Sequence, residues 1–404
     1  MNTLLKKENI KPLWAIDRAV RIAPRKGVLG ELLYFVAFFA FCLKFTLDYS
    51  GLIPERPEML NTMLVALSIS CSMAKILMQR YTPLRFVMTM IICAAIGFSA
   101  VISTNFLFLL SFLLVVSMQD IELEKIVQAG FLFKVVSIAV HVIIYIFVFH
   151  TNPDVIEFNF RAGTGEPRHF FFMGHSNTFT AFLIWSCFDY IYLKYDKLNI
   201  FRLATMWVIA VTFFMFTRSN TAMIVFAVIT VFVFADKMRK GYLDRLFTFF
   251  AKYLYIIFSL FFTLLIVTFT QLQERFLVLW YALDDFMTGR LWLAAHTFYT
   301  EGHTILGRPD MPPRVVFWRG RWFDTMTIMD NHYLGNFVSY GIINTVAVAA
   351  ALIALCGKME TREKLIIIAF SLFAIMQNDV TNIVICFALL ILGKHIYTQE
   401  HRPT

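Results

Sequence analysis

The stretch IVQAGFLFKVVSIAVHVIIYIFVF, residues 126–149, decides the fold class. Its one residue that is charged at neutral pH is Lys134. The stretch is longer than the roughly 20 residues that a helix needs to cross a hydrocarbon core about 30 Å thick. An α-helix satisfies its own backbone hydrogen bonds, which is why it is the form that such a stretch takes in lipid. This segment is therefore expected to span a membrane.

Stretches of the same kind recur along the whole chain of 404 residues. Hydrophobic residues make up 59% of the sequence and charged residues only 16%, whereas a soluble domain carries about a quarter charged residues. The pattern predicts an all-α polytopic membrane protein with about twelve transmembrane helices, or ten to eleven if the shortest ones form re-entrant hairpins. The expected spans are 29–48, 59–79, 84–103, 105–118, 126–149, 173–193, 203–216, 219–235, 253–271, 332–356, 364–377 and 381–396.

Four regions follow from this division. Residues 1–28 are polar and basic, lack the apolar core of a cleavable signal peptide, and are expected to lie on the cytoplasmic face as an interfacial segment. Residues 29–271 are expected to hold nine spans and an external loop at 150–172. Residues 272–331 are too long for a passive connection and predict an external subdomain. Residues 332–404 are expected to hold the last three spans and a cytoplasmic tail.

The positively charged residues expected outside are all arginines, whereas the cytoplasmic segments mix lysine with arginine. A guanidinium group holds two phosphate oxygens at once and keeps its proton, unlike the compact ammonium group of lysine. This external face suits a phosphate or pyrophosphate headgroup, although any one arginine can instead pair with a membrane lipid or a carboxylate. The external arginines are Arg56, Arg161, Arg168, Arg218, Arg275, Arg290, Arg308, Arg314, Arg319 and Arg321.

The remaining composition excludes several classes of site. The net charge of +9 is attributed to the topology of the spans, so no nucleic-acid partner is expected. All six cysteines fall within predicted spans and no CxxC pair occurs, so neither disulfides nor a zinc site is expected. No metal and no cofactor are predicted.

Polar residues gather in a few external motifs. The motif FMGHSNT, residues 172–178, opens the sixth span, where Ser176 or Asn177 is expected either to cap the helix or to help bind an anion. TRSNT, residues 217–221, lies between two short spans. TGRLWLA (288–294) and ILGRP (305–309) lie in the long external segment, and MDNHYLGNFVSYGI (329–342) leads into the tenth span.

In their order and spacing these motifs resemble the bacterial O-antigen and capsular polysaccharide polymerases of the Wzy type, within the O-antigen ligase and polymerase superfamily. The resemblance covers about residues 150–345. It implies a glycosyltransferase with a GT-C-like fold in the bacterial cytoplasmic membrane, with its active site facing outside. It would join undecaprenyl-pyrophosphate-linked oligosaccharides without a metal. Membrane lipids and a chain-length regulator are the further partners considered.

The resemblance also suggests roles for residues. In the related ligases a His followed by Asn precedes a Gly at the spacing that Asp330, Asn331 and Gly341 have here, so aspartate replaces histidine. Asp330 is therefore expected to be the catalytic base, with His332 as a substitute, and arginines to stabilise the departing pyrophosphate. The expected catalytic residues are Asp330, His332 and Arg290; the pyrophosphate-binding residues are Arg161, Arg168, Arg218 and Arg314; the substrate-binding residues are His175, Asn177, Asn331, Tyr333 and Trp318.

Simpler interpretations of the same residues stay open. Asp330 or Asn331 can cap the tenth span, and the tryptophans of the external subdomain, Trp318 among them, can anchor at the membrane interface rather than stack on sugars. Lys134 can reach the cytoplasmic interface or pair with Asp189. A ligase that transfers the glycan to another acceptor is the nearest alternative function. A lipid-linked oligosaccharide flippase or transporter, or a receptor, is less favoured.

Overall fold

The computed structural model describes residues 28–53, 57–103, 105–152, 159–160, 165–239, 241–269, 276–287, 290–309, 315–318, 321–324, 331–375 and 377–398. The first five helices are α1 (Val28–Tyr49), α2 (Glu58–Leu77), α3 (Pro83–Ile102), α4 (Leu107–Ser117) and α5 (Leu123–Thr151). The next four are α6 (Ser176–Leu193), α7 (Ile200–Thr217), α8 (Asn220–Met238) and α9 (Asp244–Val267). The later helices are α11 (Leu277–Phe286), α12 (Arg290–Glu301), α13 (His332–Gly335), α14 (Ile342–Leu355), α15 (Thr361–Phe373) and α16 (Ala388–Thr398).

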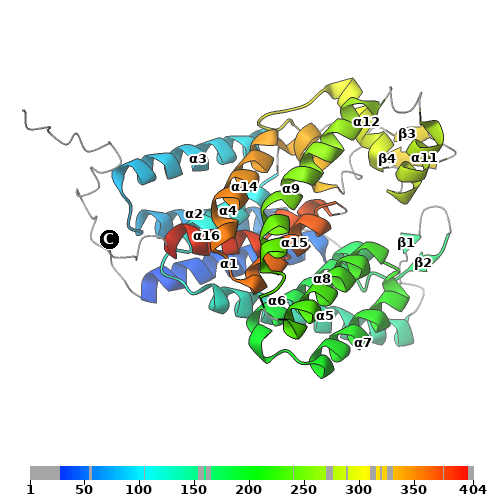
Figure 1. The fold of residues 1–404 in the computed structure, drawn as a ribbon, viewed down its shortest axis with the longest axis horizontal. Coiled ribbons are helices and arrows are strands. Elements are labelled where there is room, and N and C mark those ends of the chain that lie inside the picture. The colour runs from blue at the N-terminus through cyan, green and yellow to red at the C-terminus, as the bar shows by residue number, and fades with distance from the viewer. Residues whose placement is uncertain are drawn as a thin grey trace, which may run out of the picture.

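In the part of the chain that the structure describes, two short hairpins accompany the helices. Strands β1 (Asn159–Phe160) and β2 (Pro167–Arg168) pair antiparallel, as do β3 (Val315–Trp318) and β4 (Arg321–Asp324). Both hairpins lie on the side of the molecule that also holds α11, away from α16 (Figure 1). We call this side the hairpin end. The described part of the predicted external subdomain, residues 272–331, therefore forms α11, α12 and the β3–β4 hairpin.

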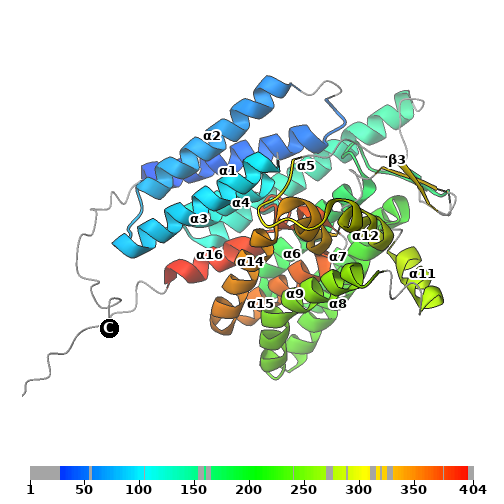
Figure 2. The ribbon, with the colours of Figure 1, turned by 90° about the horizontal axis from the view of Figure 1, so that it is seen from above.

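Among the described residues, seven helices are long and apolar enough to cross a membrane: α1, α2, α3, α5, α7, α8 and α9. Large apolar side chains such as Phe147, Phe201 and Leu264 stand exposed on their outer faces, as expected where lipid replaces water as the neighbour. The helices fit an all-α polytopic membrane protein. In Figure 2, α1, α2 and α3 lie along one side of the molecule, and α8 and α9 lie on the other.

Helices α6 and α15 are buried on almost every face. A helix with apolar residues all around its circumference packs in the interior of a bundle. The two helices contact each other through aromatic rings, because Trp185 of α6 packs against Phe373 of α15. Ion pairs fasten the start of α15, where Glu363 binds Lys394 and His395 of α16, and Lys364 binds Asp244 of α9. These two helices therefore form the centre around which the exposed helices pack.

The tenth predicted span is not one continuous helix. Helix α13 passes into a π-helical segment, η4 (Asn336–Tyr340), and α14 starts only after Gly341, whose φ is 106°. A Cβ atom on Gly341 would lie 2.8 Å from the nitrogen of Gly307 and 2.8 Å from the oxygen of Ile305. Only glycine combines this backbone angle with this close approach of another chain segment.

A Gly341→Ala substitution is expected to destabilise the protein by about 1–3 kcal/mol from the backbone angle alone, with a further cost from the contact with residues 305–307. The measurement is the thermal unfolding midpoint of purified protein in detergent. The matched control is Gly357→Ala, because a Cβ atom at Gly357 meets nothing within 4 Å. Equal midpoints for the two variants would contradict the interpretation.

The eleventh and twelfth predicted spans are separated by a longer break. Helix α15 ends at Phe373 and α16 begins at Ala388, with a 3-10 turn, η6 (Asn378–Thr381), and irregular backbone between them. Residues 380–387 are all buried. Irregular backbone at such depth is tolerated where protein surrounds it or where it lines a cavity. The break supplies one wall of a polar pocket.

Candidate functional site

Two sequence motifs meet in one cluster at the hairpin end. The Arg168 guanidinium donates from Nε to the carbonyl of Thr217 at 2.8 Å and from Nη2 to Oδ1 of Asn177 at 2.8 Å. The hydroxyl of Ser219 donates to the same Asn177 oxygen at 3.1 Å. The segment before α6 and the α7–α8 turn are thus joined through side chains. Of the predicted residues, Arg168, Asn177 and the turn that holds Arg218 lie together.

His175 caps α6, which corrects the prediction of Ser176 or Asn177 as the cap. Its Nδ1 accepts a hydrogen bond from the backbone N–H of Asn177 at 3.1 Å. Gly174 precedes it with φ 68°, and a Cβ atom there would lie 2.9 Å from the carbonyl oxygen of Tyr49. The glycine of the FMGHSNT motif therefore lets this loop pack against the end of α1.

Arg218 ends α7 in the left-handed conformation, with φ 51° and ψ 33°. Its backbone N–H donates to Phe214 O, and its side chain is exposed. Within the described ranges its guanidinium makes no hydrogen bond or ion pair. An arginine presented in this way beside Arg168 offers free donors to an anion.

His169 extends this cluster toward α5. Its ring contacts the hydroxyl of Tyr145, and its backbone N–H donates to Phe216 O. Burial lowers the pKa of the His169 imidazole below its usual 6.5. The ring is therefore neutral at pH 7, so the positive charge of this cluster comes from the arginines.

His332 is the centre of a second group of polar residues. Nδ1 lies 3.2 Å from the carbonyl oxygen of Asn378, and Nε2 lies 3.0 Å from both the Tyr255 hydroxyl and Asn336 Nδ2. A carbonyl only accepts, so Nδ1 carries the hydrogen and the Nε2 lone pair receives the Asn336 amide. A role as base would require His332 to lose one of these partners.

Two other predicted substrate residues have structural partners. Asn331 caps α13, because its Oδ1 accepts from the backbone N–H of Leu334 at 3.1 Å. Tyr333 is buried, its hydroxyl donates to Ser371 O at 2.8 Å, and Phe262 stacks on its ring. Tyr333 was predicted to bind substrate, but its ring is already covered by other aromatic rings in the protein core.

His332 lines a polar pocket with residues that the sequence analysis missed. Its walls come from η4 and α14, from the break between α15 and α16, and from the ends of α3 and α4. The empty volume is about 450 Å³, including the part open to solvent. The polar residues that line it are Ser99, Ser103, Asn105, His332, Asn336, Tyr340, Asn344, Asn378, Thr381 and Asn382. We call it the asparagine pocket.

A signal for this pocket was present in the sequence. His332, Asn336, Tyr340 and Asn344 follow one another at intervals of four, which places them along one helical face. Asn378 and Asn382 repeat the same interval. Polar residues in single file on one face of an otherwise apolar segment indicate a lined cavity.

The ILGRP motif packs on the motif that contains η4. Thr304 N–H donates to Phe337 O, Arg308 N–H to Ser339 O, and Ile343 N–H to Ile305 O. The Arg308 guanidinium donates to Glu301 O and Gly302 O, at the end of α12. Arg308 thus has the structural role that was left open for any single external arginine.

The other predicted residues are only partly covered by the described structure. Arg161, Arg314 and Asp330 lie outside the described residues. The backbone of Arg290 begins α12 and that of Trp318 ends β3, and the positions of both side chains lie outside the description. Within the described ranges, no group of three or more His, Cys, Asp or Glu side chains is arranged to hold a metal ion.

Lys134 pairs with Asp189, which confirms that alternative for this residue. The Lys134 ammonium lies 2.7 Å from Asp189 Oδ2 and donates to Ile385 O at 2.9 Å. Both side chains are buried. The pair thus links α5 and α6 to the break that lines the asparagine pocket.

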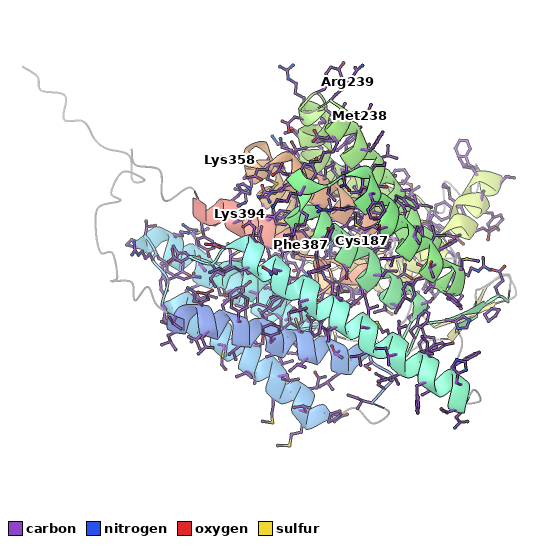
Figure 3. All side chains as sticks on the ribbon, turned by 90° about the horizontal axis from the view of Figure 1, so that it is seen from below. Cys187, Met238, Arg239, Lys358, Phe387 and Lys394 are labelled. Carbon is purple, nitrogen blue, oxygen red and sulfur yellow. The ribbon has the colours of Figure 1, made fainter. Side chains whose placement is uncertain are left out.

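An apolar groove lies between α5, α6 and α7. Its empty volume is about 1240 Å³, including the part open to the surroundings, and its walls are almost wholly apolar. Cys187 of α6, labelled in Figure 3, lines it. Phe213 also lines it, one turn before Thr217, and contacts Phe171 and Phe179. The groove therefore reaches the cluster that contains Arg168.

Comparison of the chain with protein-family models, with curated proteins and with solved structures finds no match.

Proposed function

We propose that the chain is a membrane glycosyltransferase of the Wzy polymerase type, with a GT-C-like fold and about twelve membrane-crossing segments. It joins undecaprenyl-pyrophosphate-linked oligosaccharide repeat units, and its hairpin end faces the outside of the bacterial cytoplasmic membrane. The observation that carries this proposal is the position of Arg168 and Arg218 beside the apolar groove. Arginine side chains next to an apolar groove suit a lipid that has a diphosphate head group and a long hydrocarbon tail.

The arginine cluster suits a diphosphate for a physical reason. Arg168 is held by Thr217 and Asn177, so its charge stays in place, whereas the Arg218 guanidinium is exposed. A fixed positive charge stabilises the negative charge that grows on a leaving diphosphate without reorganising during the reaction. Phe213 places the groove one turn from this cluster, so a single lipid can contact both.

The proposed reaction is a substitution at an anomeric carbon. A hydroxyl oxygen of one lipid-linked unit forms a bond to the anomeric carbon of another, and the bond from that carbon to the diphosphate breaks. The hydroxyl proton passes to the Asp330 carboxylate, and the lipid diphosphate leaves as an anion. Asp330 is preferred to His332 as the base because Nε2 of His332 already receives hydrogen bonds from Tyr255 and Asn336.

The test uses purified protein in nanodiscs with one synthetic undecaprenyl-pyrophosphate-linked repeat unit. A ladder of longer products, with and without EDTA, is the expected result, because arginines rather than a metal neutralise the leaving group. Transfer of the glycan to a different acceptor without a ladder would indicate the ligase alternative. Recovery of unchanged substrate would contradict both transferase functions.

A further inference from the structure

The apolar groove between α5, α6 and α7 opens toward the space that lipid fills. Helix α6 forms its floor, where Leu183 and Cys187 are buried, and α5 and α7 each pack on α6 to form its walls. The side chains of Val135, Ile143 and Ile209 line the groove and are exposed. An apolar side chain exposed on a membrane-spanning helix contacts hydrocarbon. The groove is therefore accessible from within the bilayer.

The serine and threonine hydroxyl groups in the lining already have partners. Ser186 donates to the carbonyl of Phe182 at 2.7 Å, and Thr205 donates to the carbonyl of Phe201 at 3.0 Å, each within its own helix. A hydrocarbon chain forms no hydrogen bonds, so it loses none when it leaves its neighbours for such walls. The lining of the groove thus favours an apolar chain.

The length of the groove matches one leaflet of a bilayer. On α5 its lining runs from Phe131 to Ile143, and on α7 it runs from Phe201 to Phe213. At the rise of an α-helix each of these walls is about 18 Å long. The hydrocarbon core is about 30 Å thick, so one leaflet contributes about 15 Å. One acyl chain of a single leaflet therefore has about the length of the groove.

One end of the groove is basic. Arg202, in the first turn of α7, lines the groove and donates from Nη1 to the carbonyl of Lys197 at 2.7 Å. Lys194 and Lys197, in the turn between α6 and α7, have exposed side chains, and Asp196 is the one carboxylate within residues 194–202. This end carries a net positive charge. Basic residues between membrane-spanning helices at the lipid surface attract anionic head groups.

This basic end is separate from the cluster that contains Arg168. Arg202 lies in the first turn of α7, whereas Arg218 ends that helix. The helical rise puts about 24 Å between the two residues, so one phosphate cannot contact both. A head group bound at Arg202 therefore belongs to a lipid of the leaflet opposite to the hairpin end.

We propose that the apolar groove holds one acyl chain of an anionic phospholipid, and that Arg202 binds the phosphate of that lipid at the turn between α6 and α7. The acyl chain lies on α6 beside Cys187, and the head group lies near Lys194 and Lys197. The inference goes beyond the proposed function, because this lipid is bound unchanged and is not a substrate.

Arg202→Gln tests the contact with the head group. The glutamine amide keeps a donor for the carbonyl of Lys197 but carries no charge. The matched control is Arg239→Gln, because Arg239 is also exposed away from the hairpin end, at the end of α8, and lies outside the lining of the groove. A general attraction of anionic lipids to this face would be weakened equally by both variants.

Ala139→Phe tests the contact with the acyl chain. Ala139 lines the groove and is exposed, so a phenylalanine ring there occupies the open space of the groove without displacing the core. The matched control is Val140→Phe. Val140 is the next residue of α5 and is also exposed, but it lies outside the lining of the groove.

The measurement is native mass spectrometry of purified protein in detergent, titrated separately with palmitoyl-oleoyl phosphatidylglycerol and with the matching phosphatidylcholine. Wild-type protein and both controls are expected to bind phosphatidylglycerol more tightly than phosphatidylcholine. Arg202→Gln is expected to bind phosphatidylglycerol about fivefold more weakly, the usual effect of one basic residue at a membrane surface, with little change for phosphatidylcholine. Ala139→Phe is expected to bind both lipids more weakly.

Four results would overturn the inference. Wild-type protein could bind the two phospholipids equally or bind neither. Arg239→Gln could weaken binding as much as Arg202→Gln does, or Ala139→Phe could bind lipid as well as Val140→Phe. A mass of two chains without bound lipid, lost in Ala139→Phe, would assign the groove to a second copy of the protein.

The lipid titration and the elongation assay fail independently. The substrate tail and the acyl chain would use the same walls, but their head groups lie at opposite ends of α7, and the titration contains no lipid-linked sugar. If wild-type protein makes a ladder but does not prefer phosphatidylglycerol, this inference fails and the polymerase assignment stands. If phosphatidylglycerol binding depends on Arg202 but no ladder or transfer forms, the inference stands and the polymerase assignment fails.

Discussion

An Arg218→Gln variant is expected to elongate lipid-linked repeat units about 10²–10³ times more slowly than wild-type protein, the usual cost of removing one donor that stabilises a developing anion. The reason is the exposed guanidinium at the α7–α8 turn, beside Arg168 and above the groove. The loss is expected mainly in kcat, because the charge on the diphosphate grows in the transition state. The measurement is the initial rate of ladder formation in nanodiscs.

Two further variants sharpen this result. Arg218→Lys keeps the charge but loses the forked donor geometry, so its rate is expected to lie between those of wild type and Arg218→Gln. Arg239→Gln is the control, since Arg239 is exposed at the other end of α8 (Figure 3). A wild-type rate for Arg218→Gln would remove the arginine cluster from the mechanism.

An Asp189→Ala variant is expected to lose about 3–5 kcal/mol of stability, because it leaves the buried ammonium of Lys134 without its counter-charge. Among the described residues, the Ile385 carbonyl would remain as the one partner of the Lys134 ammonium. The measurement is the thermal unfolding midpoint in detergent.

The double variant Lys134→Met, Asp189→Leu tests the cause of this loss. It removes both charges and fills their space with apolar groups, so it is expected to recover most of the stability. If the double variant is no more stable than Asp189→Ala, the loss comes from packing at residue 189 and not from the unpaired charge.

Hydropathy alone predicted most of the helices. Each expected span overlaps a helix, and the limits of α1, α2 and α3 lie within about two residues of the prediction. The breaks were missed. The window that identifies the span 332–356 contains Gly341, yet its apolar flanks keep the average high. The strained angle arises from contact with residues 305–307, which lie far away in sequence.

The candidate site was predicted in part, for a similar reason. Arg168, Asn177 and Arg218 were singled out by residue type, and the structure brings them together through Thr217 and Ser219. The asparagine pocket was missed because its walls come from three segments that lie far apart in the sequence. Tyr333 was misjudged because its sequence position does not reveal that Phe262 covers its ring.

The buried pair of Lys134 and Asp189 also bears on how the chain enters the bilayer during synthesis. A lone lysine at mid-helix opposes insertion by about 2.5–3.5 kcal/mol. Asp189 lies on α6, the next helix to be synthesised. The translocon is therefore expected to retain α5 until α6 emerges and to release the two helices together, with the charges of Lys134 and Asp189 paired. The positions of Lys134 and Asp189 on consecutive helices thus predict that α5 and α6 enter the bilayer together.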